Sequence, residues 1–229
     1  MSSETNSWHD YWAGRKGRFA YDVVARFYRD HLIRPSLARA LARYAKPGDA
    51  LLHAGCGSGQ VDRGLDSTYR ITALDLSSLA LDLYREANGK RSRLIAGSIF
   101  DFPFRGSSFD AVYNLGVMEH FEHEDVVRAL RELHRVLKPR GYAVLFWPPE
   151  MGASVLFFKG LHFAASKVAG REVRFHPEEI TRVRSRGHAT RMLASAGFDL
   201  VAYEFGLHDA FTHAVVVGRR RSGIASRTG

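Results

Sequence analysis

The stretch LLHAGCGSGQ, residues 51–60, decides the fold. A short apolar run leads directly into a turn that contains Gly55, Gly57 and Gly59. Glycine lets the backbone turn sharply and approach a ligand, because no Cβ atom stands in the way. In an open α/β sheet such a turn lies at the carboxyl end of the first strand, where ligands bind. The stretch therefore predicts a strand over Ala50–Ala54 that is followed by a binding loop.

The next apolar run predicts a second strand over Ile71–Leu76, near whose end stands an acidic residue, Asp75. A carboxylate here can accept two hydrogen bonds from the ribose hydroxyls of an adenosine group. Asp75 could also cap the helix expected over Ser77–Asn88, and the two roles are compatible. The spacing Gly-x-Gly-x-Gly puts Gln60 at the third glycine position of the dinucleotide-binding pattern, one residue after Gly59, so a bound pyrophosphate is less expected.

Strands and helices alternate through the middle of the chain. The alternation implies parallel β-α-β units with right-handed crossovers. The further elements expected here are strands over Leu94–Ala96, Phe109–Leu115 and Tyr142–Trp147, and a helix over Val126–Leu137 that ends in a turn at 138–141.

Both ends of the chain add elements to this core. Apolar residues at helical spacing cover Ala20–Tyr44, where Pro35 should start a second helix or kink the first. Near the other end, a helix over Ala189–Ala196 precedes strands over Asp199–Phe205 and Ala210–Gly218. A short turn separates those two strands, so we expect them to be antiparallel neighbours.

Composition narrows the class of protein. The 229 residues include a single cysteine, Cys56, which excludes an internal disulfide and fits a reducing cytoplasm. Neither an apolar stretch long enough to span a membrane nor a secretory signal is expected. The net charge of +9 is uneven, since residues 151–229 carry twelve Lys and Arg against six Asp and Glu. Such a basic segment is typical of a solvated surface, or of contact with nucleic acid, anionic lipid or an acidic substrate.

Several blocks, in order between Ala50 and Gly218, resemble the class I S-adenosylmethionine-dependent methyltransferases, especially the group with ubiquinone and menaquinone biosynthesis enzymes. The blocks are LLHAGCGSG, ITALDLS, LIAGSIFDFPFRGSSFDAVYNLGVMEHF, LRELHRVLKPRGYAVLFWPP and RMLASAGF. The resemblance implies a doubly wound, Rossmann-like α/β fold. Its seven-stranded, mostly parallel sheet would have an antiparallel last strand, and its cofactor would be S-adenosylmethionine.

The resemblance also implies which residues bind the cofactor. Gly55 and Gly57, with Cys56 between them, should lie beside its methionine part, and Asp75 should hold the ribose. The remaining expected contacts are Leu76 against the adenine, Ser98 and Ile99 at the adenine edge, and Asn114 or Leu115 beneath the sulfonium.

Two of the expected binding residues depart from the family pattern. His53 stands where the family often has Asp or Glu, and a neutral imidazole accepts only one hydrogen bond. Ser98 replaces an acid, and its hydroxyl would accept from the adenine amino group more weakly than a carboxylate does. Both departures predict a weaker cofactor site that the backbone still supports.

His120 is the candidate catalytic residue, because it follows the fourth predicted strand. A hydroxyl or acidic carbon acceptor benefits from a general base, although a structural histidine at the start of a helix remains the alternative. Some quinone-pathway relatives carry Glu-x-x-Glu-His here and use a divalent metal. In this chain the first of those positions is Gly116, which leaves only Glu119 and His120, so we expect no metal.

The function that these features predict is O- or C-methylation of a small, lipid-like or quinone-like molecule. A non-catalytic protein of the same fold and a nicotinamide-dependent oxidoreductase are the alternatives. Nucleic acid is disfavoured as a substrate, because Asn114-Leu115-Gly116-Val117 replaces the Asn/Asp-Pro-Pro-aromatic run of base-amine methylases.

We expect a single domain, with a helical lid inserted after the fifth strand. Residues 153–169 predict a helix that is apolar over most of its circumference, and it is either core, a lid over the acceptor, or a membrane contact. The location is accordingly expected to be cytoplasmic, with peripheral contact to the inner face of the membrane as one alternative. The expected parts are a helical cover (1–48), the cofactor-binding core (49–147), the lid (148–187), a closing helix and strand pair (188–219) and a tail (220–229).

Overall fold

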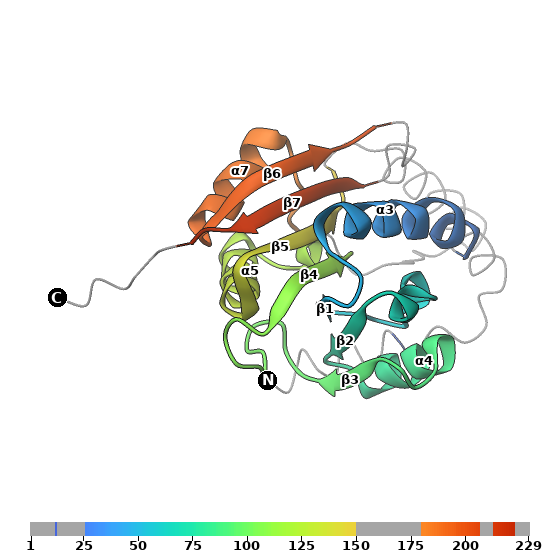
Figure 1. Ribbon diagram of the computed structural model, residues 1–229. Coiled ribbons are helices and arrows are strands. Elements are labelled where there is room, and N and C mark those ends of the chain that lie inside the picture. The colour runs from blue at the N-terminus through green and yellow to red at the C-terminus, as the bar shows by residue number, and fades with distance from the viewer. Residues whose placement is uncertain (1–11, 13–25, 150–179, 207–212, 223–229) are drawn as a thin grey trace.

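A single sheet organises the protein, as the computed structural model in Figure 1 shows. The structure describes residues 12, 26–149, 180–206 and 213–222. Within these residues, seven strands form the sheet in the order β3-β2-β1-β4-β5-β7-β6. The strands are β1 (Ala50–Ala54), β2 (Arg70–Asp75), β3 (Arg93–Ala96), β4 (Phe109–Leu115), β5 (Leu137–Trp147), β6 (Phe198–Glu204) and β7 (Ala214–Arg220).

The pairing of the strands confirms the predicted fold class. The first five strands pair in parallel, whereas β7 runs antiparallel to both β5 and β6. The last strand therefore inserts between β5 and β6. This is the mostly parallel seven-stranded sheet with an antiparallel last strand that the sequence predicted.

Helices cover both faces of the sheet, because successive side chains of a strand point to opposite sides. Leu51 belongs to the apolar cluster beneath α3, whereas its neighbour Leu52 belongs to the cluster beneath α5 and α7. Tyr84 of α4 packs on Ala73, which lies on the same side of the sheet as α3. The α-helices within the described residues are α3 (Arg34–Tyr44), α4 (Ser78–Asn88), α5 (His123–Val136) and α7 (Arg186–Ser195).

The predicted helix at the N-terminal end changes its winding before Pro35. A π-helical turn, η1 (Arg29–Ile33), leads directly into α3, which begins at Arg34. Proline has no N–H and its ring clashes with the carbonyl four residues earlier, so the regular helix cannot run through it. The part of this prediction over residues 20–25 lies outside the described residues.

The turn predicted after α5 is instead the start of β5. Leu137 already pairs with Phe109, and the register is irregular before Ala111 pairs with Tyr142. Arg140 has a φ of 65°, and a Cβ on Gly141 would lie 2.8 Å from the Asp110 carbonyl oxygen. The turn-forming residues therefore form a bulge within a paired strand.

The closing elements lie close to their predicted positions. Helix α7 begins at Arg186, three residues before the predicted start, because the Ser185 hydroxyl accepts a hydrogen bond from the His188 N–H at 3.1 Å. Strand β7 begins at Ala214 rather than Ala210, and its antiparallel pairing with β6 is confirmed. The helix and lid predicted over 153–169 lie outside the described residues. None of the described helices has the length and apolar character needed to cross a bilayer.

Candidate functional site

The strand order reverses between β1 and β4, and in open α/β sheets ligands bind at the carboxyl ends of the strands on either side of such a reversal. The glycine loop leaves β1 there, and Val117 follows β4 on the other side. A Cβ on Gly55 would lie only 2.7 Å from the Val117 Cγ2 atom. The two loops therefore meet closely, and they do so because Gly55 has no side chain.

The start of the glycine loop is fixed to the end of β2. The N–H groups of Gly55 and Cys56 both donate to the Leu74 carbonyl oxygen, at 2.8 and 2.9 Å. Gly55 adopts a φ of 71°, a conformation that costs other residues about 1–2 kcal/mol. The turn thus directs the following N–H, that of Gly57, toward Asp75.

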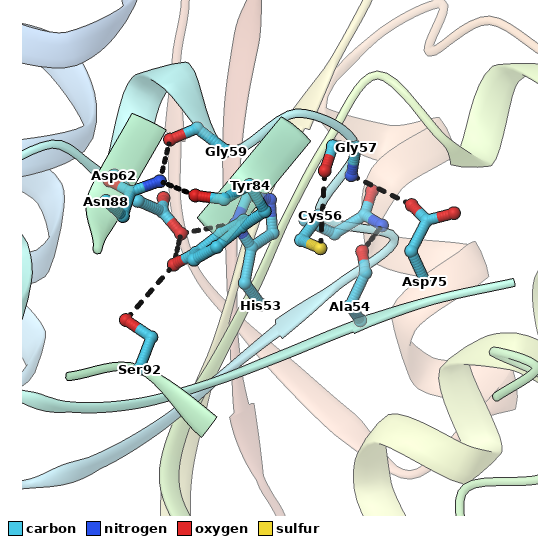
Figure 2. A network of polar contacts seen from close by, with 11 residues as sticks. His53, Ala54, Cys56, Gly57, Gly59, Asp62, Asp75, Tyr84, Asn88 and Ser92 are labelled. Atoms are coloured by element: carbon cyan, nitrogen blue, oxygen red, sulfur yellow. Dashed lines mark hydrogen bonds and ion pairs between the residues drawn. The ribbon is translucent and has the colours of Figure 1, made fainter. Parts of the chain in front are cut away.

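The Asp75 carboxylate lies at the centre of this arrangement. Its Oδ2 accepts from the Gly57 N–H at 2.8 Å (Figure 2). Its Oδ1 accepts from the Ser77 N–H at 2.9 Å. Burial raises the pKa of Asp75, although these N–H donors and the nearby His53 act in the opposite direction. A carboxylate oxygen has two lone pairs, so each oxygen can still accept a hydroxyl. A dihydroxylated sugar fits this acceptor pair.

Ser77, rather than Asp75, caps α4. The Ser77 hydroxyl oxygen accepts from the Ala80 N–H at 3.4 Å. Asp75 accepts a hydrogen bond from the N–H of Ser77 and so supports the cap from two residues earlier in the chain. The capping role weighed for Asp75 therefore belongs to Ser77.

The residues expected around the adenine lie on neighbouring strand ends. Leu76 follows β2 directly and is half-buried. The Gly97 N–H donates to the Asp75 carbonyl oxygen at 3.0 Å, which brings Ser98 and Ile99 next to the end of β2. The Ser98 hydroxyl oxygen accepts from the Phe100 N–H at 3.2 Å. The Ser98 hydroxyl oxygen is thus already hydrogen-bonded within its own loop.

Asn114 and Leu115 end β4 beside the glycine loop. Asn114 is fully buried, and its Nδ2 donates to the Ala54 carbonyl oxygen at 2.6 Å. This contact fixes the end of β1, the residue before the loop begins. Leu115 is half-buried and packs with the α3 cluster.

His53 lies beneath the loop, with its imidazole directed away from Asp75. Its Nδ1 donates to the Asp62 Oδ2 at 2.8 Å, and both residues are 1% exposed. Figure 2 shows His53 beside Asp62 and Tyr84, with Asp75 at the other end of the loop. The imidazole therefore binds another residue of the protein, Asp62, although His53 stands at a position expected to order the cofactor.

His120 closes the short helix η4 (Met118–His120), which follows β4. It does not start a helix, because α5 begins only at His123. Its Nε2 lies 4.0 Å from the Oε1 of Glu119, and the two side chains are 12% and 6% exposed. Within the described ranges, no three His, Cys, Asp or Glu residues are arranged to hold a metal ion.

Comparison with known proteins places these features in a family. Residues 52–145 match the family described as "Methyltransferase domain". This part of the chain is a class I S-adenosylmethionine-dependent methyltransferase domain. S-adenosylmethionine is its cofactor, and the predicted family is confirmed.

Many curated proteins and solved structures are similar to this chain, among them two curated methyltransferases and one solved structure. The malonyl-(acyl-carrier protein) O-methyltransferase of Erwinia pyrifoliae is 39% identical over 132 residues, which are 56% of this chain and 48% of that protein. The ubiquinone/menaquinone biosynthesis C-methyltransferase of Ralstonia pickettii is 29% identical over 223 residues, 87% of each protein. The chain spans about half the length, or less, of several other curated relatives.

The fold is shared with the magnesium protoporphyrin IX methyltransferase of Synechocystis PCC 6803, which was solved with bound SAH. That structure superimposes with a TM-score of 0.63 at 16% identity, covering 96% of this chain and 95% of the other.

Four residues of the methyltransferase domain site were not foreseen. Asp62, Tyr84 and Asn88 contact the loop from beneath, and no local pattern in the sequence marks them. Trp12 lies over the loop, since a Cβ on Gly57 would be 2.9 Å from its Cζ2 atom. The aromatic stretch SWHDYW, residues 7–12, is the sequence signal that could have indicated Trp12.

Cys56 lies inside the loop and is 5% exposed. Burial raises the pKa of its thiol well above the usual value, and the carboxylates of Asp75 and Asp62 act in the same direction. The thiol therefore stays protonated at neutral pH, which makes it a poor nucleophile.

Proposed function

We propose that the chain transfers the methyl group of S-adenosylmethionine to the oxygen or carbon of a small molecule. The observation that carries this proposal is the paired acceptance of the Gly57 and Ser77 N–H groups by Asp75, at the carboxyl edge of the sheet. That arrangement leaves acceptor lone pairs for the ribose beside a glycine-rich loop. When bound, S-adenosylmethionine supplies a methyl group that is already activated on a sulfonium.

In this proposal the chain's own residues bind and align. Gly55, Cys56 and Gly57 would line the methionine part of the cofactor, and Asp75 would hold the ribose. The further proposed contacts are those of His53, Leu76, Ser98, Ile99, Asn114 and Leu115. His53 and Asn114 would act indirectly, by holding the glycine loop in shape.

His120 is the proposed general base toward the acceptor. It lies just past the end of β4, and its imidazole is 12% exposed. A base within reach of a hydroxyl or acidic carbon typically contributes 10²–10⁴-fold, roughly, to the rate. Aligning the acceptor, methyl carbon and sulfur would supply most of the remaining acceleration.

The two curated relatives named above differ in the atom methylated, since one is an O-methyltransferase and the other a C-methyltransferase. We propose a lipid-like or quinone-like acceptor that is reached from a membrane surface. The apolar sequence of residues 153–169, followed by a basic stretch, supports this proposal. Co-sedimentation should rise with the anionic lipid of vesicles and weaken when Phe157 and Phe158 become serine. No sedimentation at any composition would refute the membrane contact.

Calorimetry with S-adenosylhomocysteine tests the cofactor site. Asp75→Ala should weaken binding about thirty- to hundredfold, which corresponds to roughly 2–3 kcal/mol for a lost carboxylate that accepts several hydrogen bonds. Asp82→Ala is the matched control, because Asp82 is exposed on α4. Equal affinity of folded Asp75→Ala and wild type would refute the site.

Transfer of labelled methyl to a panel of quinols, phenols and acyl thioesters tests the activity itself. On an accepted substrate, His120→Ala should lower kcat by about 10²–10⁴-fold and leave affinity for S-adenosylhomocysteine unchanged. Binding without any transfer would favour the non-catalytic alternative. A nicotinamide absorbance that co-purifies with the protein would favour the oxidoreductase.

A further inference from the structure

A buried polar cluster lies beneath the glycine loop and joins three elements. His53 comes from β1, Asp62 from the short helix η2 (Gln60–Asp62), and Tyr84 from α4. The Asp62 Oδ2 accepts from the His53 Nδ1–H at 2.8 Å and from the Tyr84 hydroxyl at 2.7 Å (Figure 2). All three side chains are buried. One carboxylate oxygen therefore holds a strand and a helix together.

A carboxylate in such a place is costly unless it is paired and hydrogen-bonded. The His53 Nδ1 is its basic partner among the described residues, 2.8 Å from the Asp62 Oδ2. The ring of Tyr113 stacks on the imidazole with the centroids 4.4 Å apart, which fixes the ring plane. Burial raises the pKa of Tyr84, and the negative charge of Asp62 raises it further. The Tyr84 hydroxyl therefore remains a hydrogen-bond donor. The cluster is thus a fixed arrangement of two donors around one acceptor.

The cluster is connected to the loop through Gly59. The Gly59 carbonyl oxygen accepts from the Asp62 N–H at 3.0 Å and from the Asn88 Nδ2 at 2.9 Å. A Cβ on Gly59 would lie 2.0 Å from the Tyr84 Cδ2 atom, so the ring packs directly against the backbone. The Gly59 N–H in turn donates to the Cys56 carbonyl oxygen at 3.0 Å.

We propose that Asp62 is a positioning residue for the cofactor loop. Its carboxylate holds His53 and Tyr84 in place, these fix Gly59 from beneath, and Gly59 sets the half of the loop that presents the Gly57 N–H to Asp75. Asp62 itself does not touch the cofactor. This inference rests on the proposed cofactor binding, which it deepens by naming the residue that preforms the loop.

The test compares isosteric variants in calorimetry with S-adenosylhomocysteine, under conditions where circular dichroism finds each variant folded. Asp62→Asn removes the charge, and Tyr84→Phe removes one of the two donors. Tyr69→Phe is the control, since Tyr69 is also buried but precedes β2 at the opposite edge of the sheet. Affinity should fall about tenfold in Asp62→Asn and about threefold in Tyr84→Phe, as expected for one or two hydrogen bonds, and should not change in Tyr69→Phe.

Amide hydrogen exchange separates positioning from general destabilisation. In ligand-free Asp62→Asn and Tyr84→Phe, exchange at Gly57 and Gly59 should accelerate while the amides of β5 keep their wild-type rates. Uniform acceleration across the sheet, or wild-type affinity in both variants, would overturn the proposal. If Asp62→Asn does not fold, Tyr84→Phe decides alone. If wild-type protein does not bind S-adenosylhomocysteine, the proposed function is wrong. The exchange rates of the ligand-free variants would still test whether Asp62 positions the loop.

Discussion

At Gly59, one missing Cβ atom decides how closely α4 approaches the loop. Gly59 and Gly64 both have positive φ, of 60° and 84°, so alanine would be strained at either position. Only at Gly59 would the new Cβ also overlap the Tyr84 ring, whereas nothing lies within 4 Å at Gly64. The comparison therefore separates backbone strain from packing.

We predict that Gly64→Ala lowers the free energy of unfolding by about 1 kcal/mol, the cost of positive φ alone. Gly59→Ala should lower it by about 2–4 kcal/mol, because overpacking adds its own penalty. Urea denaturation followed by tryptophan fluorescence measures both. Equal losses would mean that the Tyr84 ring moves away at little cost.

Residues differ in how far the sequence alone locates them. The position of Asp75 at the end of β2 could be predicted, because it directly follows an apolar run. The contact of His53 with Asp62 could not be predicted, since it depends on how η2 folds back beneath the loop. The same limit applies to Tyr84, whose hydrogen bond to Asp62 spans 22 residues.

At the scale of elements, the start of β5 is joined to β1 and β4 by one carboxylate, that of Asp110. The Lys138 ammonium group donates to both oxygens of Asp110, at 2.8 and 2.9 Å, and the Ala50 N–H donates to Oδ2 at 3.0 Å. Burial alone would raise the pKa of Asp110, but the hydrogen bonds from Lys138 and Ala50 outweigh it and lower the pKa. The start of β1, β4 and β5 is thus coupled through this group.

We predict that Asp110→Asn lowers the free energy of unfolding by about 1 kcal/mol at neutral pH, a modest value because the Lys138 side chain is 42% exposed and solvent screens the pair. A carboxyl with a lowered pKa stabilises above its unfolded value of about 3.9, and the effect is lost as pH falls through the folded value. The gap between wild type and variant in denaturant midpoint should therefore narrow as the pH falls below about 3.9. A gap that stays constant as the pH is lowered further would contradict this assignment.

Elements were predictable where local pattern and tertiary pairing agree. The bounds of β1 and β4 match the predicted strands, because both are apolar runs buried on two faces. The stretch Lys138–Gly141 was predicted as a turn from its proline and glycine. Pairing with β4 overrides that preference and turns the same residues into a bulged strand.

At the scale of the molecule, the two apolar layers share one sheet. Leu37 of α3 and Leu130 of α5 are fully buried on opposite faces, against alternate residues of the same strands. We expect both layers to unfold together. Leu37→Ala and Leu130→Ala should each lower the free energy of unfolding by about 2–5 kcal/mol.

Each variant should keep coincident transitions by fluorescence and circular dichroism, the sign of two-state unfolding. Separate transitions in either variant would mean that one layer melts without the other. The fold was predictable at this scale from the alternation of strands and helices. The acceptor was not, because its pocket depends on loops whose sequence carries no strong pattern.

The protein's single cysteine, Cys56, lies in the glycine loop, so chemical labelling of its thiol can report on the motion of the loop. Cys56 is buried, and its pKa is raised by that burial and by Asp75 and Asp62, so the closed loop should resist alkylation. Iodoacetamide would then react only during excursions in which the loop opens, and the reaction rate reports how often these occur. Mass spectrometry of the native sequence suffices, because no second thiol competes. Saturating S-adenosylhomocysteine should slow the labelling, and Asp62→Asn should speed it.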